Sequence, residues 1–180
     1  MKKIIAFVFG VLFTICVQAQ TDSIGVYLVR NDVATSRVEV INYNQTKISG
    51  GLKGKAKLVF DNATSVNHVN SPATFRLYFG TPSPYDAAKY YMFTPSYSAK
   101  DFSVGKFEVK KGKRYLTTAV VSIIGSKVGA DKAKDISIEY KQLRNNVCEI
   151  IITGPAGEYC IMPITNGVGG YTGVFDFTIE

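Results

Sequence analysis

The chain has 180 residues, and 21 Lys and Arg against 14 Asp and Glu give it a net charge of +7. His68 and the two cysteines after the predicted signal peptide, Cys148 and Cys160, lie far apart in the sequence and lack the number and spacing of ligands that a zinc site needs. The absence of Trp excludes the Cys–Trp–Cys core of antibody-type domains. The basic balance favours anionic partners without selecting one.

The first 19 residues have the three parts of a secretory signal peptide. Lys2 and Lys3 form its positive start, and an uncharged apolar run follows. Small residues at Val17 and Ala19 occupy the positions that signal peptidase reads. The run of about 14 residues is short of the roughly 20 that span a bilayer. We therefore predict signal peptide 1–19 and an exported protein, in the periplasm, on the cell surface or secreted.

The remaining residues, 20–180, fit a single domain with a sizeable core. They keep 19 basic and 14 acidic residues, a net charge of +5, and no further run is apolar and long enough for a transmembrane segment. A lipid anchor on Cys16 is the alternative to simple cleavage, although Ile15 before it is larger than lipoprotein processing prefers.

Short β-like runs separated by turn residues continue to the end of the chain. The expected strands cover Ile24–Val29, Arg37–Tyr43, Ala56–Phe60, Ala73–Phe79, Phe102–Lys110, Arg114–Ile124, Ile136–Lys141, Val147–Thr153, Glu158–Met162 and Gly173–Ile179. The weak helical candidate is Tyr85–Tyr91. This pattern predicts an all-β protein, an antiparallel β-sandwich of immunoglobulin-like architecture, with a β-barrel as the alternative.

Four tyrosines lie among Pro, Ser, Asp and Lys in the long segment before residue 102: Tyr85, Tyr90, Tyr91 and Tyr97. Exposed tyrosines suit sugar rings or protein partners, and these four are candidate ligand or partner contacts. The alternative is that they cover one end of the sandwich. Ser23, in Asp22-Ser23-Ile24, is a candidate O-glycosylation site.

The segment FEVKKGKRY predicts a hairpin with a two-residue turn at Lys111-Gly112. Lys110 would then oppose Lys113, and Val109 would share the core face with Phe107. Lysines at such a tip protect a sheet edge from pairing, or they bind an anion. The candidate anion-binding residues are Lys110, Lys111, Lys113 and Arg114, with Lys53, Lys55 and Lys57.

The segment VCEIIITGPAGEYCIM predicts a second hairpin across the Gly-Pro-Ala-Gly turn. Its register would put Cys148 and Cys160 on opposite faces, which favours two separate thiols over a disulfide. Glu149 and Glu158 would lie together on the solvated face.

Two tail segments, GPAGEYCIMPI and GVFDFTIE, with the KGKR hairpin before them, resemble a pattern in uncharacterised exported proteins of Bacteroidetes. The resemblance covers Phe102–Glu180. It implies an exported β-sandwich domain and no catalytic residue.

The sequence lacks the residues that most catalytic sites need, because His68 is the only histidine and lies in a polar loop. We therefore expect no cofactor and a non-enzymatic cell-envelope module with a binding or structural role. The expected partners are an anionic polysaccharide or another envelope protein, and export argues against nucleic acid. The alternatives are a glycan-binding or adhesin- or fimbria-like subunit, and a hydrolase with an unrecognised carboxylate site.

We expect the mature chain to begin at Gln20, because Val17-Gln18-Ala19 presents small residues directly after the apolar run. Intact-mass measurement of the protein from its native host tests this. A mass that retains Met1, or that includes a diacylglyceryl group on Cys16, would contradict it.

Overall fold

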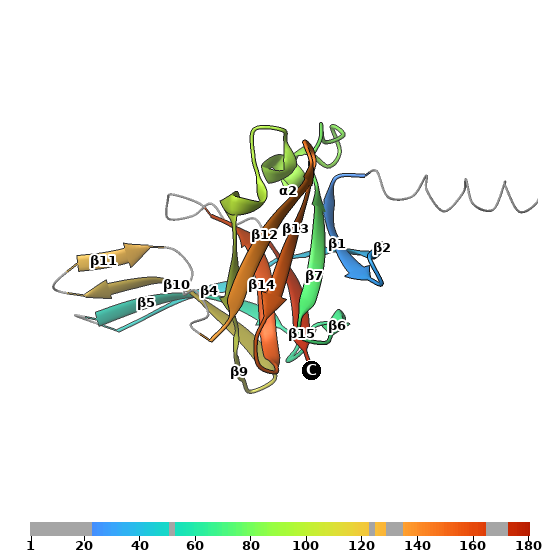
Figure 1. Ribbon diagram of the computed structural model, residues 1–180. Helices are drawn as coiled ribbons and strands as arrows, with labels where there is room; N and C mark the ends of the chain where they lie inside the picture. Colours follow the sequence, from blue (N-terminus) through green and yellow to red (C-terminus); the bar gives the residue numbers. More distant parts are fainter. Residues whose placement is uncertain (1–22, 51–52, 123–124, 129–134, 165–172) are drawn as a thin grey trace, which may run out of the picture.

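The computed structural model describes residues 23–50, 53–122, 125–128, 135–164 and 173–180, so the predicted signal peptide lies outside the described residues. The described strands form three sheets, nearly all antiparallel, and none of the three closes into a barrel (Figure 1). The predicted all-β sandwich is confirmed.

Sheet A has the order β12-β13-β7-β1-β2. Its strands are β12 (Ser137–Arg144), β13 (Val147–Thr153), β7 (Ala73–Tyr78), β1 (Gly25–Arg30) and β2 (Val33–Val38). Sheet B has the order β3-β15-β14-β8, and β6 adds to β15 in parallel. Its strands are β3 (Val40–Ile41), β15 (Val174–Ile179), β14 (Gly157–Pro163), β8 (Phe102–Lys106) and β6 (His68–Val69).

Sheet C has the order β11-β10-β5-β4, with β9 paired to β10. Its strands are β11 (Gly125–Val128), β10 (Lys113–Ser122), β5 (Lys53–Asp61), β4 (Gln45–Ser49) and β9 (Glu108–Lys110). Much of sheet C projects sideways from the sandwich as an arm (Figure 1).

Sheet B is the middle layer, and its central strands β14 and β15 are buried on both faces. Phe177 and Tyr159 belong to the core shared with sheet A, where Phe177 packs against Phe75 with ring centroids 4.7 Å apart. Alternate residues such as Cys160 and Met162 belong to a second core shared with sheet C. The near-continuous apolar sequence of β14 and β15 is therefore explained by neighbours on two sides.

Two segments that look like single strands in the sequence are each divided between two sheets. The predicted strand Arg37–Tyr43 bends at Glu39, so that β2 lies in sheet A and β3 in sheet B. The predicted strand Phe102–Lys110 likewise divides at Phe107, between β8 in sheet B and β9 in sheet C. Phe107 is 5% exposed, and its amide donates a 2.9 Å hydrogen bond to the Glu158 carbonyl.

The predicted hairpin between Val147–Thr153 and Glu158–Met162 is wrong, because β13 pairs with β12 and β7 while β14 pairs with β15 and β8. The turn between them carries the chain from sheet A to sheet B. Cys148 and Cys160 are both free thiols, as the sequence favours, and they belong to different cores.

Glu149 and Glu158 are also not on a solvated face, since they are 7% and 8% exposed. Glu149 accepts two hydrogen bonds from Arg76, at 2.6 and 3.0 Å, across the outer face of sheet A. Glu158 faces sheet C and pairs with Arg114. Each buried carboxylate therefore has an arginine that offsets the cost of its burial.

A buried ionic cluster joins sheets B and C, and we call it the Arg114 cluster: Arg114, Asp176, Glu158, Thr64 and Thr178. Arg114 donates to Asp176 Oδ2 at 2.6 Å and to Glu158 Oε2 at a longer 3.4 Å. Glu158 Oε1 accepts from the hydroxyls of Thr64 at 2.9 Å and Thr178 at 2.7 Å. The cluster thus holds sheet C, sheet B and the loop before β6 together.

Short helical turns cover one end of the sandwich, at the top of Figure 1. They are α2 (Ala87–Tyr90), η1 (Tyr91–Phe93) and, nearer to β8, η2 (Ala99–Asp101). The predicted helix at Tyr85–Tyr91 is thus confirmed as a single turn of four residues that lies within the predicted range. Tyr90 and Phe93 anchor this end in the core, where both rings pack on Phe175.

We expect Arg114→Ala to lower the free energy of unfolding by about 3–5 kcal/mol, because it leaves two carboxylates buried without their cation. The matched control is Lys113→Ala. Lys113 is half exposed in its 3.0 Å pair with Asp61, so its loss should change stability by about 0.5 kcal/mol or less. Urea denaturation measures both variants, and equal effects would contradict a stabilising role for the cluster.

Burial raises the pKa of the Cys160 thiol above its ordinary value of 9.0. Above about pH 9 the unfolded chain loses this proton while the folded chain keeps it, so stability should fall as the pH rises. The limiting slope for one group is about 1.4 kcal/mol per pH unit.

The control variant is Cys160→Ala, which has no thiol at position 160 to titrate. Its stability should be lower at neutral pH, and its difference from the original protein should shrink as the pH rises above about 9. A difference that stays constant over this range in urea denaturation would show that the folded thiol ionises normally.

Candidate anion-binding face

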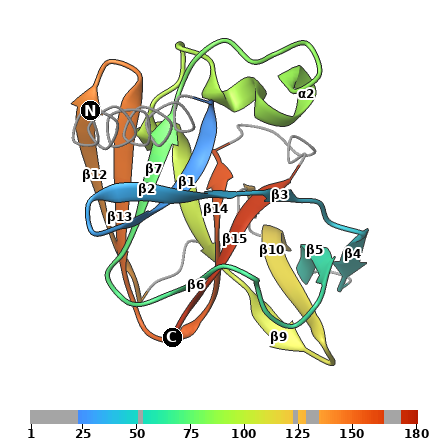
Figure 2. The same cartoon turned by 90° about the vertical axis from the view of Figure 1, so that its right-hand side faces the viewer.

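Sheet C brings the predicted lysine segments onto neighbouring strands. Lys55 and Lys57 lie on β5, which pairs along its length with β10. Lys110 and Lys113 lie on β9 and β10, at the base of the arm. Figure 2, turned by 90° from Figure 1, shows β4, β5, β10 and β9 beside one another on one side of the molecule.

The strand register decides which side chains share a face, since directly opposed residues and residues two apart point the same way. Lys57 opposes Lys47 on β4 and Thr117 on β10, and Lys113 opposes Lys110 on β9. We call the resulting surface the lysine face. It consists of Lys47, Lys55, Lys57, Lys110, Lys113 and Tyr115, with the acids Asp61 and Glu108.

Tyr115 of β10 lies within the lysine face near cations of β5, the adjacent strand, and of β4, the strand beyond it. Lys47 Nζ is 5.5 Å and Lys57 Nζ is 5.9 Å from the centre of its ring, within range of cation–π attraction. Lys57 also pairs with Glu108, and this hydrogen bond is the main reason that the pKa of Glu108 lies below its ordinary value.

The lysine face keeps a net charge of +3, because its five lysines meet two acids. Lys57 and Lys113 are the two that form ion pairs with described carboxylates. Lys47, Lys55 and Lys110 are exposed and have no ion-pair partner among the described residues. Three cations therefore remain available to an anion from solution.

The predicted β9–β10 hairpin is confirmed, with Lys110 opposite Lys113 and Val109 opposite Arg114. Lys111 and Gly112 have φ of 51° and 72°, the left-handed conformation of a type I′ turn. Lys111 is exposed at this tip. The predicted core position of Val109 is wrong, because β9 extends beyond the second core and leaves this side chain 48% exposed.

Two other predicted residues do not contribute to this face. Arg114 is not accessible to an anion from solution, because it is 3% exposed and its charge is held in the Arg114 cluster. The backbone of Lys53 pairs with Ser122 at the far end of β5, and its side chain is outside what the structure describes.

The candidate aromatic residues divide into buried and exposed positions. Tyr90 is 1% exposed, with the Arg37 guanidinium 4.4 Å above its ring, so its ring is not accessible to a partner. Tyr91 and Tyr97 are partly buried against the core, as expected of residues that cover an end of the sandwich. Tyr85 is 98% exposed. Ser23, also exposed, is hydrogen-bonded to the Tyr27 hydroxyl and stays a predicted glycosylation site.

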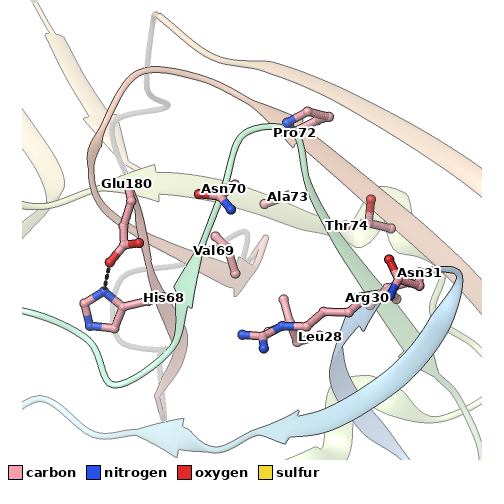
Figure 3. Close-up of a pocket in the computed structure, with 11 residues that line it drawn as sticks. Leu28, Arg30, Asn31, His68, Val69, Asn70, Pro72, Ala73, Thr74 and Glu180 are labelled. Carbon is pink, nitrogen blue, oxygen red and sulfur yellow. Dashed lines mark hydrogen bonds and ion pairs between the residues drawn. The ribbon is translucent and has the colours of Figure 1, made fainter.

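Sequence reasoning missed a polar pocket (Figure 3). It lies beside β6 and the end of β15, at the opposite end of the sandwich from the helical turns (Figure 1). Its polar residues come from separate segments and include Arg30, His68, Asn70 and Glu180. His68 is exposed as predicted, but its Nδ1 is 2.8 Å from Glu180 Oε1. Nothing in the sequence marks these segments as neighbours, since their contact depends on the parallel pairing of β6 with β15.

The described residues offer little for metal or acid–base chemistry. They contain no group of three or more His, Cys, Asp and Glu side chains that could hold a metal ion. The buried acids Glu158 and Asp176 share Arg114 between two sheets, and they line neither the polar pocket nor the smaller pocket beside β12. Within the same residues, no helix has the length and apolar character needed to cross a bilayer.

Comparisons with protein-family models, curated proteins and solved structures give no match for this chain. Among the described residues, the lysine face is a surface on which strand register brings several side chains of one charge together.

Proposed function

We propose that this protein is an exported, non-enzymatic module of the cell envelope that binds anionic polysaccharide through the lysine face. The single observation that supports this most is the strand register, which aligns lysines from β4, β5, β9 and β10 on one surface of sheet C. The signal-peptide pattern at residues 1–19 supports an envelope location.

A polymer suits this surface better than a small anion. The unpaired lysines Lys47, Lys55 and Lys110 lie on three different strands, so no single carboxylate can contact all of them. Tyr115 between them offers a half-buried aromatic ring, a kind of side chain that suits the apolar face of a sugar ring. A chain of charged sugars could contact the cations and the ring in succession.

The expected affinity is modest and sensitive to salt, because exposed charges are screened within about 8–10 Å at physiological ionic strength. We expect binding to polygalacturonate at about 50 mM salt and much weaker binding at about 300 mM salt. Neutral dextran of similar length should bind at neither salt concentration. Biolayer interferometry with immobilised protein measures these affinities.

The decisive variant is Lys55→Gln with Lys110→Gln, which removes two unpaired cations from the lysine face. Its affinity for polygalacturonate should fall roughly tenfold, as expected for a loss of about 1.4 kcal/mol. The matched control is Lys100→Gln with Lys141→Gln, two exposed lysines outside sheet C with the same change in charge. Equal affinities of the two variants, or no binding at low salt, would contradict the proposal. The lysines would then serve only to protect a sheet edge from pairing.

A further inference from the structure

The polar pocket at the end of the sandwich has a volume of about 540 Å³, which is in the range of small-molecule sites. Its apolar side is formed by buried residues, Leu28, Val69 and Ala73, which are 4%, 8% and 2% exposed. Its polar side is formed by the end of β1, by the segment from His68 to Thr74 and by Glu180.

Arg30 is the central charged group of this pocket. Its side chain extends across the pocket, and its guanidinium points toward His68 (Figure 3). Arg30 makes no ion pair or side-chain hydrogen bond with any other described residue. It can therefore offer a planar pair of N–H donors to an incoming carboxylate.

His68 and Asn70 supply hydrogen-bonding groups of a different kind. The Glu180 carboxylate holds His68 through Nδ1 at 2.8 Å, which leaves Nε2 available to a ligand. The Asn70 side chain is directed toward the same space and has both a donor and an acceptor. Such groups match the hydroxyls of a sugar, each of which can donate and accept.

We propose that this pocket binds a single uronic acid residue, a six-membered sugar that carries one carboxylate. The carboxylate would pair with Arg30, the ring hydroxyls with His68 Nε2 and the Asn70 amide, and the apolar ring face would pack on Val69. Arg30 distinguishes such a ligand from a neutral sugar, which has no charge for it to pair with, and the acid of the pocket lining, Glu180, is held by His68 Nδ1.

This site is independent of the lysine face. The pocket residues belong to β1, β6, β7 and the end of the chain after β15, whereas the lysine face belongs to sheet C. The pocket accepts one sugar unit and the lysine face contacts several, so the two proposals can fail separately.

Titration of isotope-labelled protein with sodium glucuronate, followed by amide NMR spectra, tests the proposal. We expect saturable shifts at residues 28–31 and 68–74 with a Kd of about 1 mM, and smaller or no shifts with glucose. Shifts confined to sheet C, equal shifts with glucose, or none up to about 20 mM ligand would overturn it.

Two variants distinguish glucuronate binding in the pocket from binding at the lysine face. Arg30→Gln, at an exposed position, should weaken glucuronate binding roughly tenfold while the remaining spectrum stays that of the folded protein. Lys55→Gln with Lys110→Gln should leave glucuronate binding unchanged. If the lysine variant loses glucuronate binding and Arg30→Gln keeps it, the pocket is not the site.

Discussion

Arg114 brings a positive charge between sheets B and C, and the position of the arm depends on how that charge is satisfied. A buried guanidinium is costly unless carboxylates meet it with good geometry. Asp176 of β15 meets it at 2.6 Å, and Glu158 of β14 lies at 3.4 Å. Both carboxylates come from adjacent strands of the middle sheet. A shift of sheet C by one residue would turn Arg114 to the other face and leave both acids without a cation.

The middle position of sheet B also explains why the chain changes sheets within apparently continuous strands. Because sheets A and C lie on opposite sides of sheet B, the chain must leave one sheet to reach the next. It passes from sheet A to sheet B at Glu39 and from sheet B to sheet C at Phe107. At Phe107 the side chain enters the second core against Phe60, with ring centroids 5.2 Å apart. The change of direction is therefore fixed by burial of the residue at the bend as well as by the strands around it.

Alternating polarity was sufficient to predict most strands, the β9–β10 hairpin and the all-β class. It could not assign strands to sheets, because the same alternation fits a partner on either side, and the predicted hairpin of β13 with β14 failed for this reason. It also placed Glu149 and Glu158 on a solvated face, and it made Arg114 a candidate for anion binding, since a paired buried charge looks the same in a sequence as a solvated one. The lysine face was partly predictable from lysine spacing, whereas its position beside Tyr115 depended on register.

The long pairing of β10 with β5 has a mechanical consequence for the arm. A pull directed along β10 would act parallel to these strands, across hydrogen bonds that run from Lys113–Asp61 to Ser122–Lys53. Such a load is shared by many bonds at once, whereas a pull across the strands would open them one after another, beginning at the exposed strand β4. The arm should therefore resist tension much better along its length than across its width.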